Sequence, residues 1–201
     1  MKYLKCIIMM MFAGIVFSAC RTTGQFSGTT ELTVLLVDEN GCGVGDCDII
    51  LSNFNKSVYG VTNKNGFCVF NNIPAGEYNL AGQKYGYTKL KPAKFDFNNK
   101  GDVFCFEILS SNFIFDTVED LYEQSLYKNA LELLDEIFCE KKTSLYSAVC
   151  LYKAYGFVLE QNNKAALLEL KKMKKSEASF SSIYDKMVNM IELQQVNDSE
   201  E

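Results

Sequence analysis

The 201-residue sequence contains no histidine and no tryptophan. Without histidine the chain has no Ser-His-Asp or Cys-His nucleophile pair, no imidazole proton shuttle and no histidine metal ligand. Without tryptophan it has no indole platform on which a sugar or a choline group could stack. It has 25 acidic and 20 basic residues, so the net charge is −5 and there is no basic footprint for nucleic acid.

The overall composition is that of a folded protein. Hydrophobic residues make up 48% of the chain and charged residues 22%. Such values are typical of one or two globular units, and they exclude a disordered chain or a multi-pass membrane protein.

The first residues have the pattern of an export signal. A short basic region with Lys2 and Lys5 precedes residues 6–17, which carry no charge. An apolar run of this length is typical of a signal-peptide core and is too short to span a bilayer, which needs about 20 apolar residues. The sequence therefore predicts a signal peptide over residues 1–19.

The end of this segment, Phe17-Ser18-Ala19-Cys20, resembles the lipobox of bacterial lipoproteins, with Phe17 where leucine is usual. In that family the signal is cut just before the cysteine, whose thiol then receives a diacylglycerol. Two or three acyl chains hold a protein at a membrane, whereas one chain is only marginal. The resemblance implies lipidation of Cys20 and a place in the bacterial cell envelope, in the periplasm or at the surface. An ordinary secretory signal and an uncleaved N-terminal helix are the alternatives.

Loss of residues 1–19 would remove Lys2 and Lys5 but no acid, so the net charge would change from −5 to −7. Anionic head groups repel an acidic protein, so the lipid would have to provide the attachment to the membrane. Residues 20–30 are mostly small and polar, which predicts a flexible lipidated tether.

Residues 31–109 show the two-residue hydrophobic period of β-strands, first at Leu32, Val34 and Leu36. Turn sequences separate the runs, most clearly at Asn65-Gly66, which tolerates positive φ. Short strands at such spacing predict a β-sandwich. The further strands are expected at residues 47–51, 58–62, 67–70, 77–81, 94–97 and 103–108. The expected core contains Ile49, Leu51, Cys68, Phe70, Tyr78 and Leu80.

Several segments of this unit together resemble the carboxypeptidase regulatory-like family and its Cna-B and transthyretin-like relatives. They are residues 36–41, Val44, Ile49, 62–66, 68–70, 73–78 and 85–87. The resemblance implies an antiparallel Greek-key β-sandwich of seven strands over residues 31–109. It also implies a spacer, stalk or binding module rather than a catalytic domain.

After Ser111 the hydrophobic period becomes helical, with Asp116 as a candidate N-cap. Short connections favour antiparallel helix pairs. The complete prediction is an α+β multidomain chain with a helical domain over residues 116–195 and a disordered acidic tail over 196–201. The five expected helices cover residues 117–126, 128–138, 144–160, 164–173 and 180–193.

Residues 128–134 and 164–170 have similar sequences and lie 36 residues apart. This spacing weakly resembles that of tetratricopeptide repeats, whose period is about 34 residues. If the resemblance holds, a concave surface would bind an extended segment of a partner. A plain helical bundle explains the same pattern, and both interpretations stay open.

Six cysteines follow Cys20, and an exported protein can form disulfides. Cys42 and Cys47 flank a turn, while Cys139 and Cys150 flank a connection between helices, so each pair could close a small loop. Cys68 is expected to be a buried free thiol. No Cys-x-x-Cys pair occurs, and the sequence predicts no metal and no cofactor.

Two further groups of side chains were considered as sites. Tyr59, Tyr85 and Tyr87 could form an exposed ligand patch, although packing over an open sheet edge is the favoured explanation for Tyr85 and Tyr87, since aromatic side chains usually pack. Four acids at one end of the sandwich lack the alternation of a calcium loop and favour solvated turns. They are Asp38, Glu39, Asp46 and Asp48.

Taken together, the sequence predicts a membrane-anchored envelope lipoprotein with a non-catalytic protein-binding or scaffold role. A surface module that binds a glycan or solute through exposed tyrosines is one alternative. A hydrolase that uses carboxylates alone is another, and it requires two acids about 5–10 Å apart in a cleft.

Overall fold

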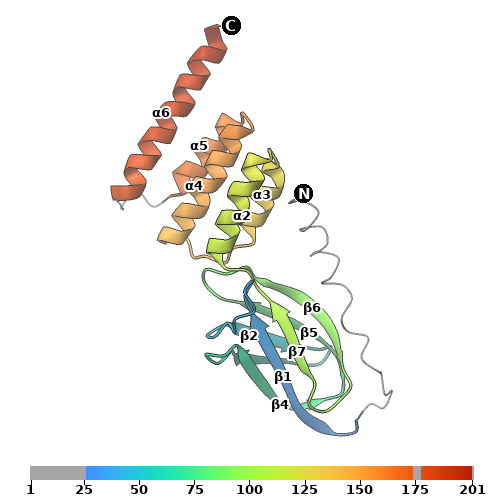
Figure 1. Cartoon of the computed structure of the whole chain (residues 1–201). Coiled ribbons are helices and arrows are strands. Elements are labelled where there is room, and N and C mark those ends of the chain that lie inside the picture. The colour runs from blue at the N-terminus through green and yellow to red at the C-terminus, as the bar shows by residue number, and fades with distance from the viewer. Residues whose placement is uncertain (1–25, 174–177, 201) are drawn as a thin grey trace.

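The structure is a computed structural model and describes residues 26–173 and 178–200. It confirms the α+β class: a β-sandwich is followed by a set of helices that stand on one end of it (Figure 1). The predicted signal peptide and Cys20 lie outside the described residues. No described helix is both long enough and apolar enough to cross a bilayer.

The sandwich consists of two sheets. One has three strands in the order β4-β1-β7, and the other has four strands in the order β3-β2-β5-β6. The seven strands are β1 Thr29–Val37, β2 Asp48–Ser52, β3 Ser57–Val61, β4 Phe67–Pro74, β5 Gly76–Gln83, β6 Leu90–Phe97 and β7 Val103–Glu107.

One pairing departs from the antiparallel prediction. β7 runs parallel to β1, with Thr33 opposite Val103 and Val37 opposite Glu107. The chain crosses from β6 in the second sheet to β7 in the first, so no hairpin forces these two strands to be antiparallel. β1 and β7 therefore both run toward the helices (Figure 1).

Between the sheets lies a core of alternating inward-facing side chains, as predicted. Leu32, Val34 and Leu80 are fully buried, and Cys68 is buried beside them. Aromatic rings fill the far end of this core, where the ring centroids of Phe95 and Phe104 lie 4.3 Å apart. The expected core residues are all found in this cluster.

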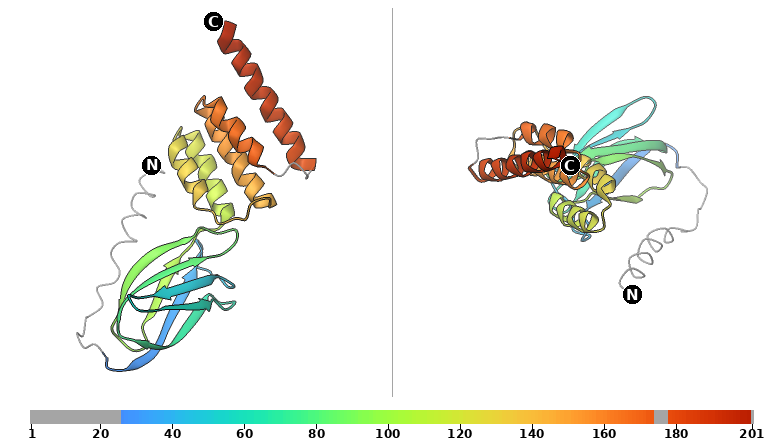
Figure 2. Two further views of the ribbon diagram at one scale, coloured as in Figure 1. Left: turned by 180° about the vertical axis from the view of Figure 1, so that it is seen from behind. Right: turned by 90° about the horizontal axis from the view of Figure 1, so that it is seen from above.

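Five helices follow in the described residues: α2 Ser111–Glu123, α3 Tyr127–Asp135, α4 Ser144–Leu159, α5 Asn163–Lys172 and α6 Ala178–Glu200. The first four form two hairpins, and α6 projects beyond them (Figure 2). Two predictions about the helix ends were wrong. α2 begins with Ser110 as its N-cap, not Asp116, because the Ser110 hydroxyl accepts a hydrogen bond from Phe113 N.

The second error concerns the C-terminus. Residues 196–200, predicted to be a disordered tail, belong to α6. No glycine or proline interrupts α6, and its glutamate and glutamine residues are good helix formers.

The two hairpins are structural repeats of each other with a period of 36 residues. In the first helices, Val118 corresponds to Ala154, and in the second helices Leu134 corresponds to Leu170; all four are buried. The turns match as well, since Ser125 and Gln161 have φ angles of 59° and 60°. The backbone N–H groups of Leu126 and Asn162 donate to carbonyl groups five residues earlier, at 2.9 and 2.8 Å.

The connection between β5 and β6 joins the sandwich to the first hairpin through backbone hydrogen bonds. Gly86 N donates to Phe138 O at 2.9 Å, and Phe138 N donates to Tyr87 O at 2.8 Å. Ser111 N, at the start of α2, donates to Gly86 O at 2.8 Å. Gly86 has a φ of 82°, which residues with a Cβ rarely adopt.

A side-chain contact strengthens the same junction. Glu39, in the turn after β1, accepts hydrogen bonds from Ser110 N at 2.9 Å and from Ser110 Oγ at 2.6 Å. Burial raises the pKa of Glu39, but the hydrogen bonds from Ser110 outweigh burial and leave the pKa below its ordinary value of 4.5. The N-cap of α2 is thus held by the sandwich.

We predict that Glu39→Gln destabilises the folded chain by about 1 kcal/mol at pH 7, because Ser110 loses a charged acceptor. The pKa of Glu39 is lower in the folded chain than in the unfolded chain, so its stabilisation is complete above about pH 4.5 and is lost as the pH falls through the folded value. Urea denaturation of both proteins at pH 7 and pH 3 measures this difference.

Glu31→Gln at an exposed position is the matched control and should leave the urea midpoint unchanged. A Glu39→Gln deficit that is as large at pH 3 as at pH 7 would show that the carboxylate charge does not stabilise the junction.

Candidate functional site

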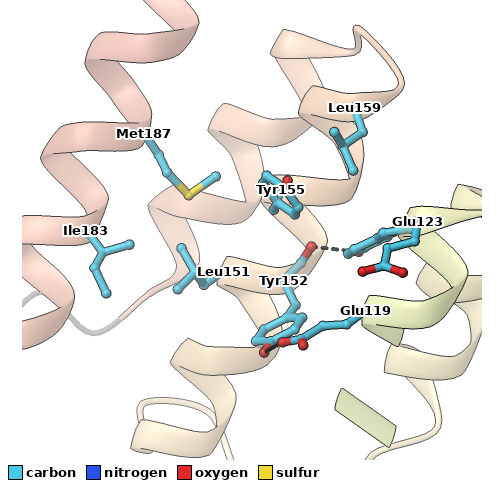
Figure 3. Close-up of a pocket in the computed structure, with 9 residues that line it drawn as sticks. Glu119, Glu123, Leu151, Tyr152, Tyr155, Leu159, Ile183 and Met187 are labelled. Carbon is cyan, nitrogen blue, oxygen red and sulfur yellow. Dashed lines mark hydrogen bonds between the residues drawn. The ribbon is translucent and has the colours of Figure 1, made fainter. Parts of the chain in front are cut away.

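The first helix of each hairpin and α6 together form a groove with a volume of about 550 Å³. Figure 3 shows that α4 forms its floor, while α2 and α6 form its two walls. Its lining residues are Glu119, Tyr122 and Glu123 from α2, Leu151, Tyr152, Tyr155 and Leu159 from α4, and Ile183 and Met187 from α6.

The 36-residue period places equivalent positions along this groove. Glu119 of α2 corresponds to Tyr155 of α4, and Glu123 corresponds to Leu159. On α4 the residues Leu151, Tyr155 and Leu159 are four apart and share one helix face. The same side of each repeat thus faces the groove, with acids on α2 and apolar or aromatic residues on α4.

A close contact between two helices sets the spacing of α2 and α4. The Tyr122 hydroxyl donates a hydrogen bond to Tyr152 O at 2.7 Å. Gly156 lies under the ring, and a Cβ at this position would meet Tyr122 Oη at 2.5 Å. Burial raises the pKa of Tyr122 far above its ordinary value, so the hydroxyl stays protonated and remains a donor.

The polar side chains of the groove lie mainly on one wall. The Tyr152 hydroxyl donates to Glu119 Oε1 at 2.5 Å. Burial and this neighbouring carboxylate raise the pKa of Tyr152 to about 12. Glu119 and Glu123 both project from α2 (Figure 3), so they do not face each other across the groove as the two acids of a glycosidase flank the scissile bond.

The three tyrosines considered as a ligand patch are not brought together. Tyr59, exposed at 75%, lines a hollow of about 680 Å³ on the outer face of the four-stranded sheet, to which neither Tyr85 nor Tyr87 contributes. Tyr87 packs against the buried cluster that contains Leu36 and Ile108. Gly86 and Tyr87 form the junction with the helices, which accounts for the position of Tyr87, whereas Tyr85 is 46% exposed.

Two of the acids at the end of the sandwich, Asp38 and Glu39, accept hydrogen bonds within the protein. Asp38 Oδ1 accepts hydrogen bonds from the backbone N–H groups of Asn40 and Cys42, each at 2.9 Å. Glu39 binds Ser110, as described above. Among the described residues no group of three or more acids or cysteines is placed to hold a metal ion.

The six described cysteines are free thiols. Cys42 is exposed in its turn, whereas Cys47 points into the core, where burial raises its pKa to about 11. Cys139 packs with the first hairpin, whereas Cys150 is buried in the cluster between α4, α5 and α6. Neither predicted disulfide is formed in this structure, and Cys68 is a buried thiol as expected.

Sequence reasoning did not identify the groove residues as a site. The repeat was detected in the second helices, at residues 128–134 and 164–170, whereas the groove is lined by the first helices. A signal was present: α2 carries Asp116, Glu119, Asp120 and Glu123 but no basic residue. The 36-residue period aligns two of these acids, Glu119 and Glu123, with the groove residues Tyr155 and Leu159 of α4.

No protein-family model and no curated protein sequence matches the chain. Among solved structures, the TIE protein of Bacillus anthracis matches 41% of this chain at 18% identity with a TM-score of 0.38. The major pilin subunit of Bacillus cereus matches 40% at 23% identity with a TM-score of 0.36. The matches span only 17% and 30% of those two chains.

The 5-hydroxyisourate hydrolase of Klebsiella pneumoniae is matched over 91% of its own length and 43% of this chain, at 20% identity and a TM-score of 0.32. Similarities of this size concern the fold of part of the chain and say nothing about what it binds.

We predict that Gly156→Ala destabilises the chain by about 1–3 kcal/mol. Replacing a glycine inside a helix with alanine usually stabilises by about 0.5–1 kcal/mol, so the expected sign is reversed. The reason is the new Cβ, which would lie 2.5 Å from Tyr122 Oη and would push α2 away from α4. The melting temperature measures the effect.

Tyr122→Phe removes the nearest clashing atom, so Gly156→Ala should cost less in the Tyr122→Phe background than in the wild type. Stabilisation by Gly156→Ala alone would mean that Tyr122 moves away freely and does not fix the helix spacing.

Proposed function

We propose that this protein is a lipid-anchored protein of the bacterial envelope that binds a segment of a protein partner in the groove between α2, α4 and α6. The observation that carries the proposal is the groove itself, because Leu151, Tyr155 and Leu159 on one face of α4 give it an apolar and aromatic floor. Tyr155 and Ile183 are 46% and 40% exposed there. Large apolar side chains left open in a concave site are typical of a binding surface.

The arrangement of hairpins supports this proposal. Helix pairs that repeat every 36 residues resemble tetratricopeptide repeats, in which stacked hairpins bury a continuous core and leave a concave surface for a ligand. Here the concave side belongs to the first helices of the repeats. The groove lies where such an array would place its partner.

The proposed role of the sandwich is that of a spacer. β1 begins at the end of the sandwich that lies away from the helices (Figure 1). A lipid on Cys20 would therefore hold the far end of the sandwich at the membrane. A strand of the length of β1, 9 residues, spans about 30 Å. The sandwich would keep the groove at roughly that distance from the lipid head groups.

The groove favours binding over catalysis. Its ionisable side chains are two glutamates on one wall and tyrosine hydroxyls. The pKa values of Tyr122 and Tyr152 are raised, so both hydroxyls stay protonated at neutral pH and cannot serve as bases. No histidine exists in the chain to serve as a base.

The lipid anchor is tested by Cys20→Ala in the bacterium that produces the protein. We expect the variant to keep its signal peptide uncleaved or to leave the membrane fraction, whereas Cys6→Ala, inside the signal, should be processed and lipidated normally. Mass spectrometry of the N-terminal peptide measures cleavage and the acyl group. Normal processing and unchanged membrane partitioning of Cys20→Ala would exclude the anchor.

The groove is tested by recovering partners with the membrane-anchored protein. Leu151→Asp places a charge on the groove floor, and Tyr155→Ala removes an aromatic contact, so both should lower partner recovery at least about tenfold. Leu168→Asp is the matched control, because Leu168 is 54% exposed on α5 and does not line the groove.

Quantitative mass spectrometry of the recovered proteins compares the variants, with circular dichroism as a check on folding. Equal recovery of the same partner by Leu151→Asp, Tyr155→Ala and wild type would place the interaction elsewhere on the molecule.

A further inference from the structure

We infer that the segment bound in the groove is an amphipathic α-helix with an apolar face flanked by lysine or arginine. This inference rests on the proposed function and specifies the conformation and charge of the partner. It differs from the extended segment that the sequence alone suggested.

The two walls of the groove differ in chemistry. The α2 wall presents the carboxylates Glu119 and Glu123, which are four residues apart on one helix face. The α6 wall presents Ile183 and Met187, and Met190, 38% exposed, follows nearly one turn later. An occupant that fits both walls must be basic along one side and apolar along the other.

The groove offers few hydrogen-bond donors for the carbonyl groups of a free peptide backbone. Among the described side chains that line it there is no lysine, arginine, asparagine or glutamine. The Tyr122 hydroxyl is used by Tyr152 O, and the Tyr152 hydroxyl is used by Glu119. Tyr155 is the remaining hydroxyl donor among the lining side chains.

An extended peptide placed there would lose water from backbone carbonyl groups that find no new donor, which costs free energy. A helix satisfies its own backbone hydrogen bonds and presents only side chains to the groove. The floor suits such an occupant, because Leu151, Tyr155 and Leu159 form a row with a four-residue spacing. Apolar side chains at positions i, i+3 or i+4, and i+7 of a bound helix can pack along that row.

The charge of the groove disfavours a second copy of this chain as the occupant. α2 carries four acids and no base. The chain as a whole has a net charge of −5, so two copies repel each other. A basic helix of a different protein gains favourable contacts with Glu119 and Glu123 at the rim.

A fluorescein-labelled 18-residue peptide of leucine, alanine and lysine, with leucines at i, i+3, i+4 and i+7 spacing, is the probe. Its binding to the full-length protein in detergent is measured by fluorescence anisotropy. Leu151→Asp serves as the blank for peptide bound to micelles. Two comparison peptides have the same leucine pattern: one has a central proline, and one has glutamate in place of lysine.

We expect the lysine peptide to bind at least about tenfold more tightly than either comparison peptide, a difference of about 1.4 kcal/mol. Glu123→Gln should weaken the lysine peptide and strengthen the glutamate peptide, whereas Glu140→Gln makes the same charge change at an exposed position outside the groove and should alter neither.

Equal affinity of the proline peptide would overturn the helical conformation, and equal affinity of the glutamate peptide would overturn the basic character. If Leu151→Asp loses the natural partner while none of the peptides binds above the blank, the helix inference is wrong and the proposed function stands. If Leu151→Asp changes neither the recovery of the natural partner nor the binding of the lysine peptide, the groove is not the binding site.

Discussion

The backbone hydrogen bonds of the β5–β6 connection are the constraint on which the rest of the molecule depends. Through Gly86 and Tyr87 this connection is bonded both to the start of α2 and to the segment after α3. Backbone bonds at both ends of a hairpin fix its position far better than a single covalent linker would. Because α2 is one wall of the groove, the sandwich determines where that wall stands.

From this fixed hairpin the groove is built by repetition. Small buried residues, Ala130 and Ala166, occur at equivalent positions of the second helices and allow each hairpin to pack closely. Tyr122 then bridges from α2 to α4 over Gly156, where only a glycine leaves room for the ring. A helix-breaking tendency at Gly156 is therefore offset by a contact that sets the width of the groove.

The sequence was a good guide to elements and a poor guide to their junctions. Period-two and period-3.6 patterns depend on neighbouring residues, and they located all seven strands and the five helices of the described residues. The bonds of Gly86 to Phe138 and of Glu39 to Ser110 join residues more than 50 positions apart, which no local pattern records. For this reason the local pattern pointed to Asp116 as the cap of α2 and to Tyr87 as a ligand contact, although Ser110 is the cap and Tyr87 forms part of the junction.

The acidic character of the chain bears both on its relation to the membrane and on the groove. At physiological salt the Debye length is about 8 Å, so the net charge acts on the membrane surface and on a partner only at close range. If Cys20 carries the proposed lipid anchor, the chain needs no electrostatic attraction to the membrane, and the carboxylates are available for another role. On α2 they lie at the rim of an apolar groove, where a cation on the partner would be partly shielded from water and would contribute more than it would on an open surface. In the proposed function, an apolar floor alone would accept many hydrophobic segments, and the acidic wall would favour segments of the opposite charge.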